Sequence, residues 1–223
     1  MYEYRPTRYN VLPPVVKNLM ILNGLMFLLT YIFPDEMFRR FGLFYVKSDF
    51  FHPYQFVTHM FMHGNEFHIL FNMFALWMFG SALENLWGPK RFLFFYFFCG
   101  LGAAALHSTV SYFEITNLEQ AGISAQKLME MKNIPTVGAS GAIYGLLMAF
   151  GMTFPNAHLM FILFPVPIKA KYFVVLLVVV ELYLGKMNLF RGEGGIAHFA
   201  HLGGMLFGYI LLRYWKKDRR HFY

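Results

Sequence analysis

Three polar clusters interrupt apolar stretches of this sequence and hold side chains that can do chemistry. The clusters are His59, His63, His68 and Asn72; Ser140 within the run Gly138–Gly145; and His198 with His201. Polar groups are costly in apolar surroundings, so each cluster needs an explanation. A serine, an imidazole and several side-chain donors are the nucleophile, general base and oxyanion stabilisers of acyl transfer. A fold that brings the three clusters together would therefore form an acyl-transfer site.

The first cluster admits three explanations. His68 and Asn72 are four residues apart, so on a helix they share one face and can aim donors at one point. They could equally form hydrogen bonds with neighbouring helices or with loop backbone. Several histidines could also bind a metal ion, but no cysteine stands near them and Glu84 lies several helical turns further along the chain. We therefore expect no metal ion and no other cofactor.

The second cluster places Ser140 among small residues at the start of a predicted helix. The glycines on both sides of Ser140 would let another backbone, or a substrate, approach closely. Gly141 and Gly145 form the small-xxx-small spacing that is typical of helix contacts in membranes. Ordinary helix packing would explain the same run, so this motif alone does not identify a nucleophile.

The third cluster lies in the last apolar stretch of the chain. His198 and His201 are three residues apart, and Gly204 and Gly208 repeat the small-xxx-small spacing after His201. A histidine beside a glycine-lined face can come unusually close to a partner helix. Taken alone, either histidine could also be a buried residue with a purely structural hydrogen bond.

The elements that must position these clusters are membrane-spanning helices. Hydrophobic residues make up 57% of the 223 residues and charged residues only 14%, against roughly 25% charged residues in soluble domains. A soluble fold of this size could not hide so much apolar surface. The single cysteine, Cys99, excludes an internal disulfide. We expect one all-α membrane domain over residues 1–223, with spans at 18–34, 67–86, 92–113, 139–154, 171–188 and 195–214.

The charge distribution predicts how this domain lies in the membrane. If both termini are cytoplasmic, most of the 19 basic residues fall in cytoplasmic segments, as the positive-inside rule requires. The net charge of +7 then reflects topology rather than nucleic-acid binding, and the basic tail after Trp215 could contact anionic lipid. In this orientation the three polar clusters lie at one depth near the outer face. The aromatic-rich loop 34–66 is expected in the membrane interface.

In three motifs the chain resembles the rhomboid family of intramembrane serine proteases. The motifs, in the family's order, are His63-x4-His68-x3-Asn72, Gly138-Ala-Ser140-Gly141-x2-Tyr144 and Ala200-His201-x2-Gly204-x3-Gly208. The resemblance covers nearly the whole chain, from the first predicted span to the sixth. It implies a six-helix bundle with both termini in the cytoplasm and an interfacial loop between the first two helices.

The resemblance also implies a role for each site residue. Ser140 would be the nucleophile of a Ser–His dyad, and the histidine with glycines three and seven residues after it, His201 rather than His198, would be its base. The remaining roles are side-chain oxyanion stabilisation by His68 and Asn72, stacking of Tyr144 on the catalytic imidazole, and support of the site by His63, Gly138 and Gly141. No carboxylate stands near His201 in the sequence, which fits a dyad, and Glu181 in the fifth span remains without a role.

The partners implied by the resemblance are transmembrane proteins and membrane lipid. Substrates would be single-span proteins that dock laterally, beside a gate formed by the fifth helix, and are cut at a small residue near the outer face. The family's first outer loop often carries Trp-Arg where this chain has Tyr54-Gln55. This departure puts the polar anchoring of the loop in doubt.

The sequence also bears on two alternative functions and on the membrane in which the protein lies. A catalytically silent rhomboid-like protein that binds membrane helices would be expected to lack Ser140 or His201, and both are present. A small transporter or metal-binding membrane protein would bind metal and would not react with serine-directed reagents. No signal peptide, transit peptide or additional domain is evident, so we expect the bacterial plasma (inner) membrane.

Overall fold

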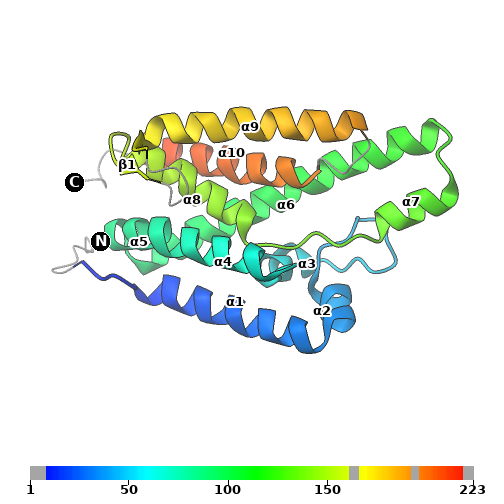
Figure 1. Ribbon diagram of the computed structural model, residues 1–223, viewed down its shortest axis with the longest axis horizontal. Helices are drawn as coiled ribbons and strands as arrows, with labels where there is room; N and C mark the ends of the chain where they lie inside the picture. Colours follow the sequence, from blue (N-terminus) through cyan, green and yellow to red (C-terminus); the bar gives the residue numbers. More distant parts are fainter. Residues whose placement is uncertain (1–8, 161–165, 192–195, 218–223) are drawn as a thin grey trace.

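The computed structural model describes residues 9–160, 166–191 and 196–217, and this part of the chain is mostly helical (Figure 1). The helices are α1 (Pro14–Ile32), α2 (Pro34–Phe41), α3 (Gln55–Thr58), the 3₁₀ helix η1 (His59–Phe61), α4 (Glu66–Ala75), the π-helical turn η2 (Leu76–Gly80), α5 (Ser81–Trp87), α6 (Pro89–Gln120), α7 (Ala125–Lys132), α8 (Ser140–Thr153), α9 (Ala170–Arg191) and α10 (Ile196–Lys217). Two short strands, β1 (His158–Leu159) and β2 (Ile168–Lys169), pair antiparallel.

The helices agree with the predicted class of an all-α membrane protein. Within the described residues, three helical segments are long and apolar enough to cross a membrane: α1, the continuous run Glu66–Trp87 and α6. Helix α8 is apolar but shorter, and α9 and α10 overlap the last two predicted ranges and extend a few residues beyond them. Helix α6 continues to Gln120, beyond the predicted third span at 92–113. Hydropathy marks where a span leaves the membrane, whereas helix propensity continues through polar residues until Gly122 adopts a positive φ of 76°.

A buried carboxylate joins the first helix to the second predicted span. Proline at the first turn of α1 suits the helix start, but the next backbone N–H groups still need acceptors. Glu84 provides them: its two carboxylate oxygens accept hydrogen bonds from the N–H groups of Val15 (3.0 Å) and Val16 (2.8 Å). Glu84 in α5 therefore caps the start of α1.

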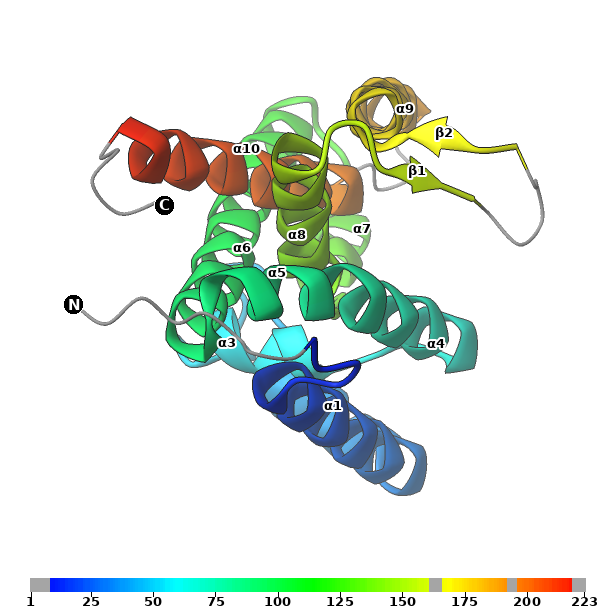
Figure 2. The same ribbon diagram turned by 90° about the vertical axis from the view of Figure 1, so that its left-hand side faces the viewer.

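Helix α8 lies in the centre of the bundle, between α10 and the α4–α5 run, with α9 at the outer edge (Figure 2). Small residues make its contact with α10 possible. A Cβ atom on Gly204 would overlap the carbonyl group of Gly141, and one on Gly208 would lie 3.1 Å from the carbonyl oxygen of Gly145. The two predicted small-xxx-small faces therefore pack against each other.

The loop between α1 and α4 folds into short helices at one end of the bundle, where α2, α3 and α7 lie (Figure 1). Gln55 anchors it from a fully buried position. Its side-chain amide donates to the carbonyls of Phe50 (2.9 Å) and Arg40 (3.3 Å), and its amide oxygen accepts the N–H of His52 (3.1 Å). The departure from the family pattern at Tyr54-Gln55 is thus compensated by a glutamine that holds the loop together.

Candidate active site

Ser140 is the first residue of α8, and the turn before it is held by the first loop. Gly138 has φ of 133°, a conformation that side chains strongly disfavour, and its N–H donates to the carbonyl of His59 at 2.9 Å. A Cβ atom on Gly138 would lie 2.9 Å from the imidazole of His68 and 3.5 Å from the Ser140 hydroxyl. Gly138 therefore lets the chain enter α8 while His68 stays beside Ser140.

The structure brings Ser140 and His201 into hydrogen-bond contact, although they are 61 residues apart. The Ser140 Oγ lies 2.9 Å from Nε2 of His201. The Tyr144 ring, one helical turn after Ser140, stacks on the His201 imidazole with centroids 4.1 Å apart and planes 4° apart. This is the stacking that the resemblance implied, and it restricts the orientation of the imidazole.

Glu181 reaches the same centre from α9. Its carboxylate lies 3.0 Å from Nδ1 of His201 and 2.6 Å from Nδ1 of His198, and it accepts a hydrogen bond from the Tyr144 hydroxyl at 2.5 Å. The Glu181 side chain is only 6% exposed. The sequence shows no carboxylate near His201, whereas the structure brings the carboxylate of Glu181 to it. The one signal in the sequence was a lone charge inside an apolar helix, which does not reveal its partner.

The two expected oxyanion residues differ in where they lie. The imidazole of His68 and the Ser140 hydroxyl both lie next to Gly138, 2.9 Å and 3.5 Å from the position of a Cβ atom on that residue. Asn72 is buried and donates one side-chain N–H to the carbonyl of His68 at 2.7 Å; within the described residues, no hydrogen bond joins it to Ser140. One further N–H of this amide is left for another acceptor.

His63 supports His68 from the loop. Its imidazole is fully buried and lies edge-on to that of His68, with ring centroids 5.0 Å apart. Burial lowers the pKa of His63 to about 4, and burial likewise lowers the pKa of His59 to about 4. Both loop histidines are therefore neutral near pH 7, and His63 packs against His68.

One group at the centre has the composition of a metal site. The carboxylate of Glu181 and one ring nitrogen each of His198 and His201 lie within 4.8 Å of one another. Two histidines and one glutamate can bind zinc. The same atoms are also joined directly by the hydrogen bonds of Glu181, and the second nitrogen of His198 lies 3.3 Å from the side-chain amide of Asn188. Hydrogen bonding alone therefore accounts for the arrangement.

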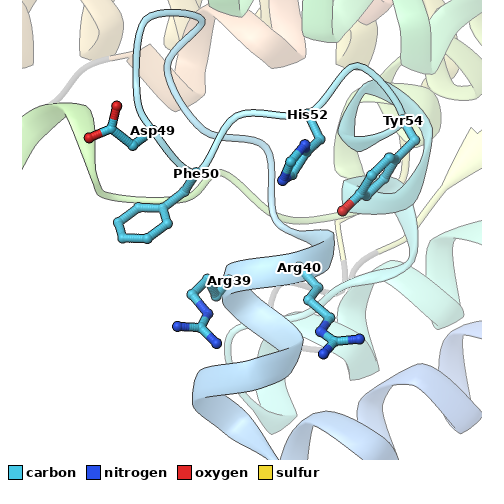
Figure 3. A pocket seen from close by; sticks show the side chains of 6 residues that line it. All are labelled: Arg39, Arg40, Asp49, Phe50, His52 and Tyr54. Carbon is cyan, nitrogen blue, oxygen red and sulfur yellow. The ribbon is translucent and has the colours of Figure 1, made fainter.

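A solvent-open pocket of about 190 Å³ lies elsewhere, between α2 and the loop that follows it (Figure 3). Its lining residues are Arg39, Arg40, Asp49, Phe50, His52 and Tyr54. Both arginines form ion pairs with Glu36. None of the lining residues belongs to the three polar clusters, so this pocket is separate from the candidate active site.

Comparisons with known proteins point to one family. Residues 51–217 match the family model of the Rhomboid domain. The chain is 33% identical over 150 residues to Rhomboid protein 1, mitochondrial, of Saccharomyces cerevisiae. These 150 residues are 67% of this chain and 38% of that protein. The chain is 31% identical over 167 residues to Presenilin-associated rhomboid-like protein A, mitochondrial, of Danio rerio (72% and 38%).

A bacterial relative is similar over the same extent of this chain. Identity to the Rhomboid protease AarA of Providencia stuartii is 28% over 159 residues, which covers 68% of this chain and 52% of that protein. The chain thus spans about half, or less, of the length of these three relatives.

Proposed function

The chain belongs to the rhomboid family, and from that premise we propose that it is an intramembrane serine endopeptidase. The observation that carries the proposal is the 2.9 Å contact between the Ser140 hydroxyl and Nε2 of His201. A serine hydroxyl hydrogen-bonded to an imidazole is the arrangement of an activated nucleophile and its general base. The stacked Tyr144 ring keeps the imidazole directed at the serine.

In this mechanism the Ser140 hydroxyl attacks the scissile carbonyl while His201 takes its proton. The oxyanion would be stabilised by the backbone N–H of Ser140 and by the side chains of His68 and Asn72. The N–H of Ser140 has no acceptor within α8, because it lies in the first turn, where the helix dipole also favours negative charge. Removing one oxyanion donor typically raises the barrier by about 3–4 kcal/mol.

We further propose that six helices cross the membrane with both termini in the cytoplasm. The described chain begins and ends at the same end of the bundle, which supports this topology (Figure 1). Substrates would be transmembrane segments of single-span proteins, cut near the outer face after lateral docking beside α9. A bacterial plasma membrane stays a prediction, because the relatives come from mitochondria as well as from a bacterium.

The test is labelling of the purified protein by a fluorophosphonate probe, which reacts with activated serines. We expect labelling of the parent and none of Ser140→Ala or His201→Ala, because these variants lack the nucleophile or its base. His198→Ala serves as the matched histidine control and should still be labelled. Labelling would be measured in detergent and in lipid, with thermal unfolding as the check that each variant is folded.

Two results would contradict the proposal. An unlabelled but folded parent in both detergent and lipid would favour the silent helix-binding protein. Labelling that is lost in His198→Ala and retained in His201→Ala would mean that the wrong histidine has been assigned as the base.

A further inference from the structure

We propose that Glu181 is a positioning residue for His201, so that this chain uses a triad of Ser140, His201 and Glu181 in place of a dyad. In this triad, called the relay below, protons move only through His201, and Glu181 takes none. The inference rests on the proposed endopeptidase function. It assigns a role to a buried charge on α9 that the dyad mechanism does not use. The three side chains come from α8, α10 and α9, so the relay exists only in the folded bundle.

The two ring nitrogens of His201 face different partners. Nε2 lies 2.9 Å from the Ser140 hydroxyl and Nδ1 lies 3.0 Å from Oε1 of Glu181. A carboxylate can only accept a hydrogen bond, so Nδ1 carries the proton and donates it to Glu181. Nε2 then presents its lone pair to the serine hydroxyl, which is the tautomer that a general base needs.

Glu181 is itself held in place by other donors. The Tyr144 hydroxyl donates to Oε1, the same oxygen that His201 uses, and Nδ1 of His198 lies 2.6 Å from Oε2. A carboxylate that is 6% exposed is costly unless it is paired and hydrogen-bonded, and three donors meet that requirement. The stacked Tyr144 therefore orients both the imidazole and the carboxylate behind it.

The relay defines where each proton goes. As the Ser140 oxygen bonds to the scissile carbon, its proton moves to Nε2 of His201, and the carbonyl electron pair moves to the oxyanion. The Nε2 proton then goes to the leaving amine as the C–N bond breaks. In the second half, water gives a proton to Nε2 as its oxygen attacks the acyl carbon, and that proton returns to Ser140 as the ester bond breaks. Glu181 stays ionised throughout and stabilises the imidazolium in both halves.

Three variants separate charge from packing. Gln has the shape of Glu but no charge, whereas Asp keeps the charge on a shorter side chain. In a relay, the order of activity is parent, then Glu181→Asp, then Glu181→Gln. In a purely structural role Gln is the better substitute, so the order of the two variants is reversed. Glu84→Gln is the matched control, since Glu84 is also a buried glutamate that caps backbone N–H groups away from Ser140.

The measurement is the rate of fluorophosphonate labelling against probe concentration, in variants whose thermal unfolding shows that they are folded. For Glu181→Gln we expect the maximal labelling rate to fall about 10- to 100-fold, the range of one charge-assisted hydrogen bond, with the half-saturating probe concentration unchanged. Glu181→Asp should retain more of the rate than Glu181→Gln, and Glu84→Gln should label as the parent does.

A measurement on the parent keeps the inference testable if the Glu181 variants do not fold. Nuclear magnetic resonance of ¹⁵N-histidine-labelled protein reports the tautomer of His201, assigned by the signal that is lost in His201→Ala. We expect the proton on Nδ1 at neutral pH. A proton on Nε2 would overturn the relay.

Three further results would each rule out the relay. A parent that labels while Glu181→Gln labels equally well, or better than Glu181→Asp, overturns the relay and leaves the proposed function intact. One equivalent of zinc in the purified parent that is absent from Glu181→Gln would also overturn it, in favour of a metal site at Glu181, His198 and His201. A parent that is never labelled removes the proposed function and the relay together.

Discussion

Gly138 shows at the scale of one residue how backbone conformation prepares the site. Its φ of 133° lies in the region that favours glycine, and its missing side chain leaves room for the imidazole of His68. Its N–H is bonded to the carbonyl of His59, so the strained turn is held by the loop rather than by α8 itself. The position therefore determines both where Ser140 begins the helix and how close His68 can lie.

Gly138→Ala should damage the site as well as the fold. The Cβ would meet the His68 ring at 2.9 Å, and a non-glycine residue in this backbone region typically costs about 1–3 kcal/mol. We expect a lower thermal midpoint and slower fluorophosphonate labelling of the folded fraction. Gly64→Ala is the control, because the nearest atom to its Cβ would be 4.0 Å away. Equal effects of the two substitutions would contradict this account.

At the scale of the element, the contact between α8 and α10 decides the distance between Ser140 and His201. Gly204 packs so closely on Gly141 that no side-chain atom fits between them. Small residues allow such backbone contact, and van der Waals packing then stabilises the helix pair in a membrane. Ser140 and His201 precede these glycines on their helices, so the close crossing is what brings them to 2.9 Å.

Gly204→Ala should separate the two helices. The added methyl group would overlap the carbonyl of Gly141, and overpacking of this kind typically costs about 1–3 kcal/mol. We expect a lower midpoint of unfolding together with a large loss of labelling, because the Ser140–His201 distance increases. Gly24→Ala in α1 is the control: nothing lies within 4 Å of its Cβ, and alanine favours a helix over glycine by about 0.5–1 kcal/mol. A stable, fully labelled Gly204→Ala would show that the crossing is not critical.

The first loop is joined to the helix bundle through buried neutral histidines, which matters at the scale of the whole molecule. His59 is buried, donates from Nδ1 to the carbonyl of Gln55 at 2.8 Å, and offers its own carbonyl to Gly138. His63 is buried against His68. Burial lowers the pKa of both loop histidines from 6.5 to about 4, so the fold favours their neutral forms.

The stability of the folded protein should therefore depend on pH between about 6.5 and 4. In this range the unfolded chain binds protons at His59 and His63 that the folded chain does not, so stability is full above the upper value and falls as the pH decreases. Thermal unfolding in detergent across this range measures the effect. His59→Asn keeps a donor for the Gln55 carbonyl but does not titrate, so its midpoint should fall less steeply. An unchanged slope would remove His59 as a cause.

The sequence by itself indicated an all-α membrane protein and singled out the candidate site residues. Apolar length marks the helices because each must satisfy its own backbone hydrogen bonds in lipid. Ser140 and Tyr144 could be placed on one face because helical spacing relates residues within a single helix. The choice of His201 over His198 rested instead on the resemblance to the rhomboid family's glycine pattern. In the structure Tyr144 stacks on His201, and His68 and Ser140 both lie next to Gly138.

Only the tertiary structure decided that Glu181 lies behind His201, that Asn72 donates to its own helix, and that Gln55 anchors the first loop. Each of these depends on how one segment is rotated and shifted against another. Helical spacing holds no information about that rotation, because the same apolar pattern lets α9 turn several ways against α10. In the folded protein, α9 has the rotation that places the Glu181 carboxylate within hydrogen-bond distance of Tyr144, His198 and His201. These three donors come from two different helices, α8 and α10.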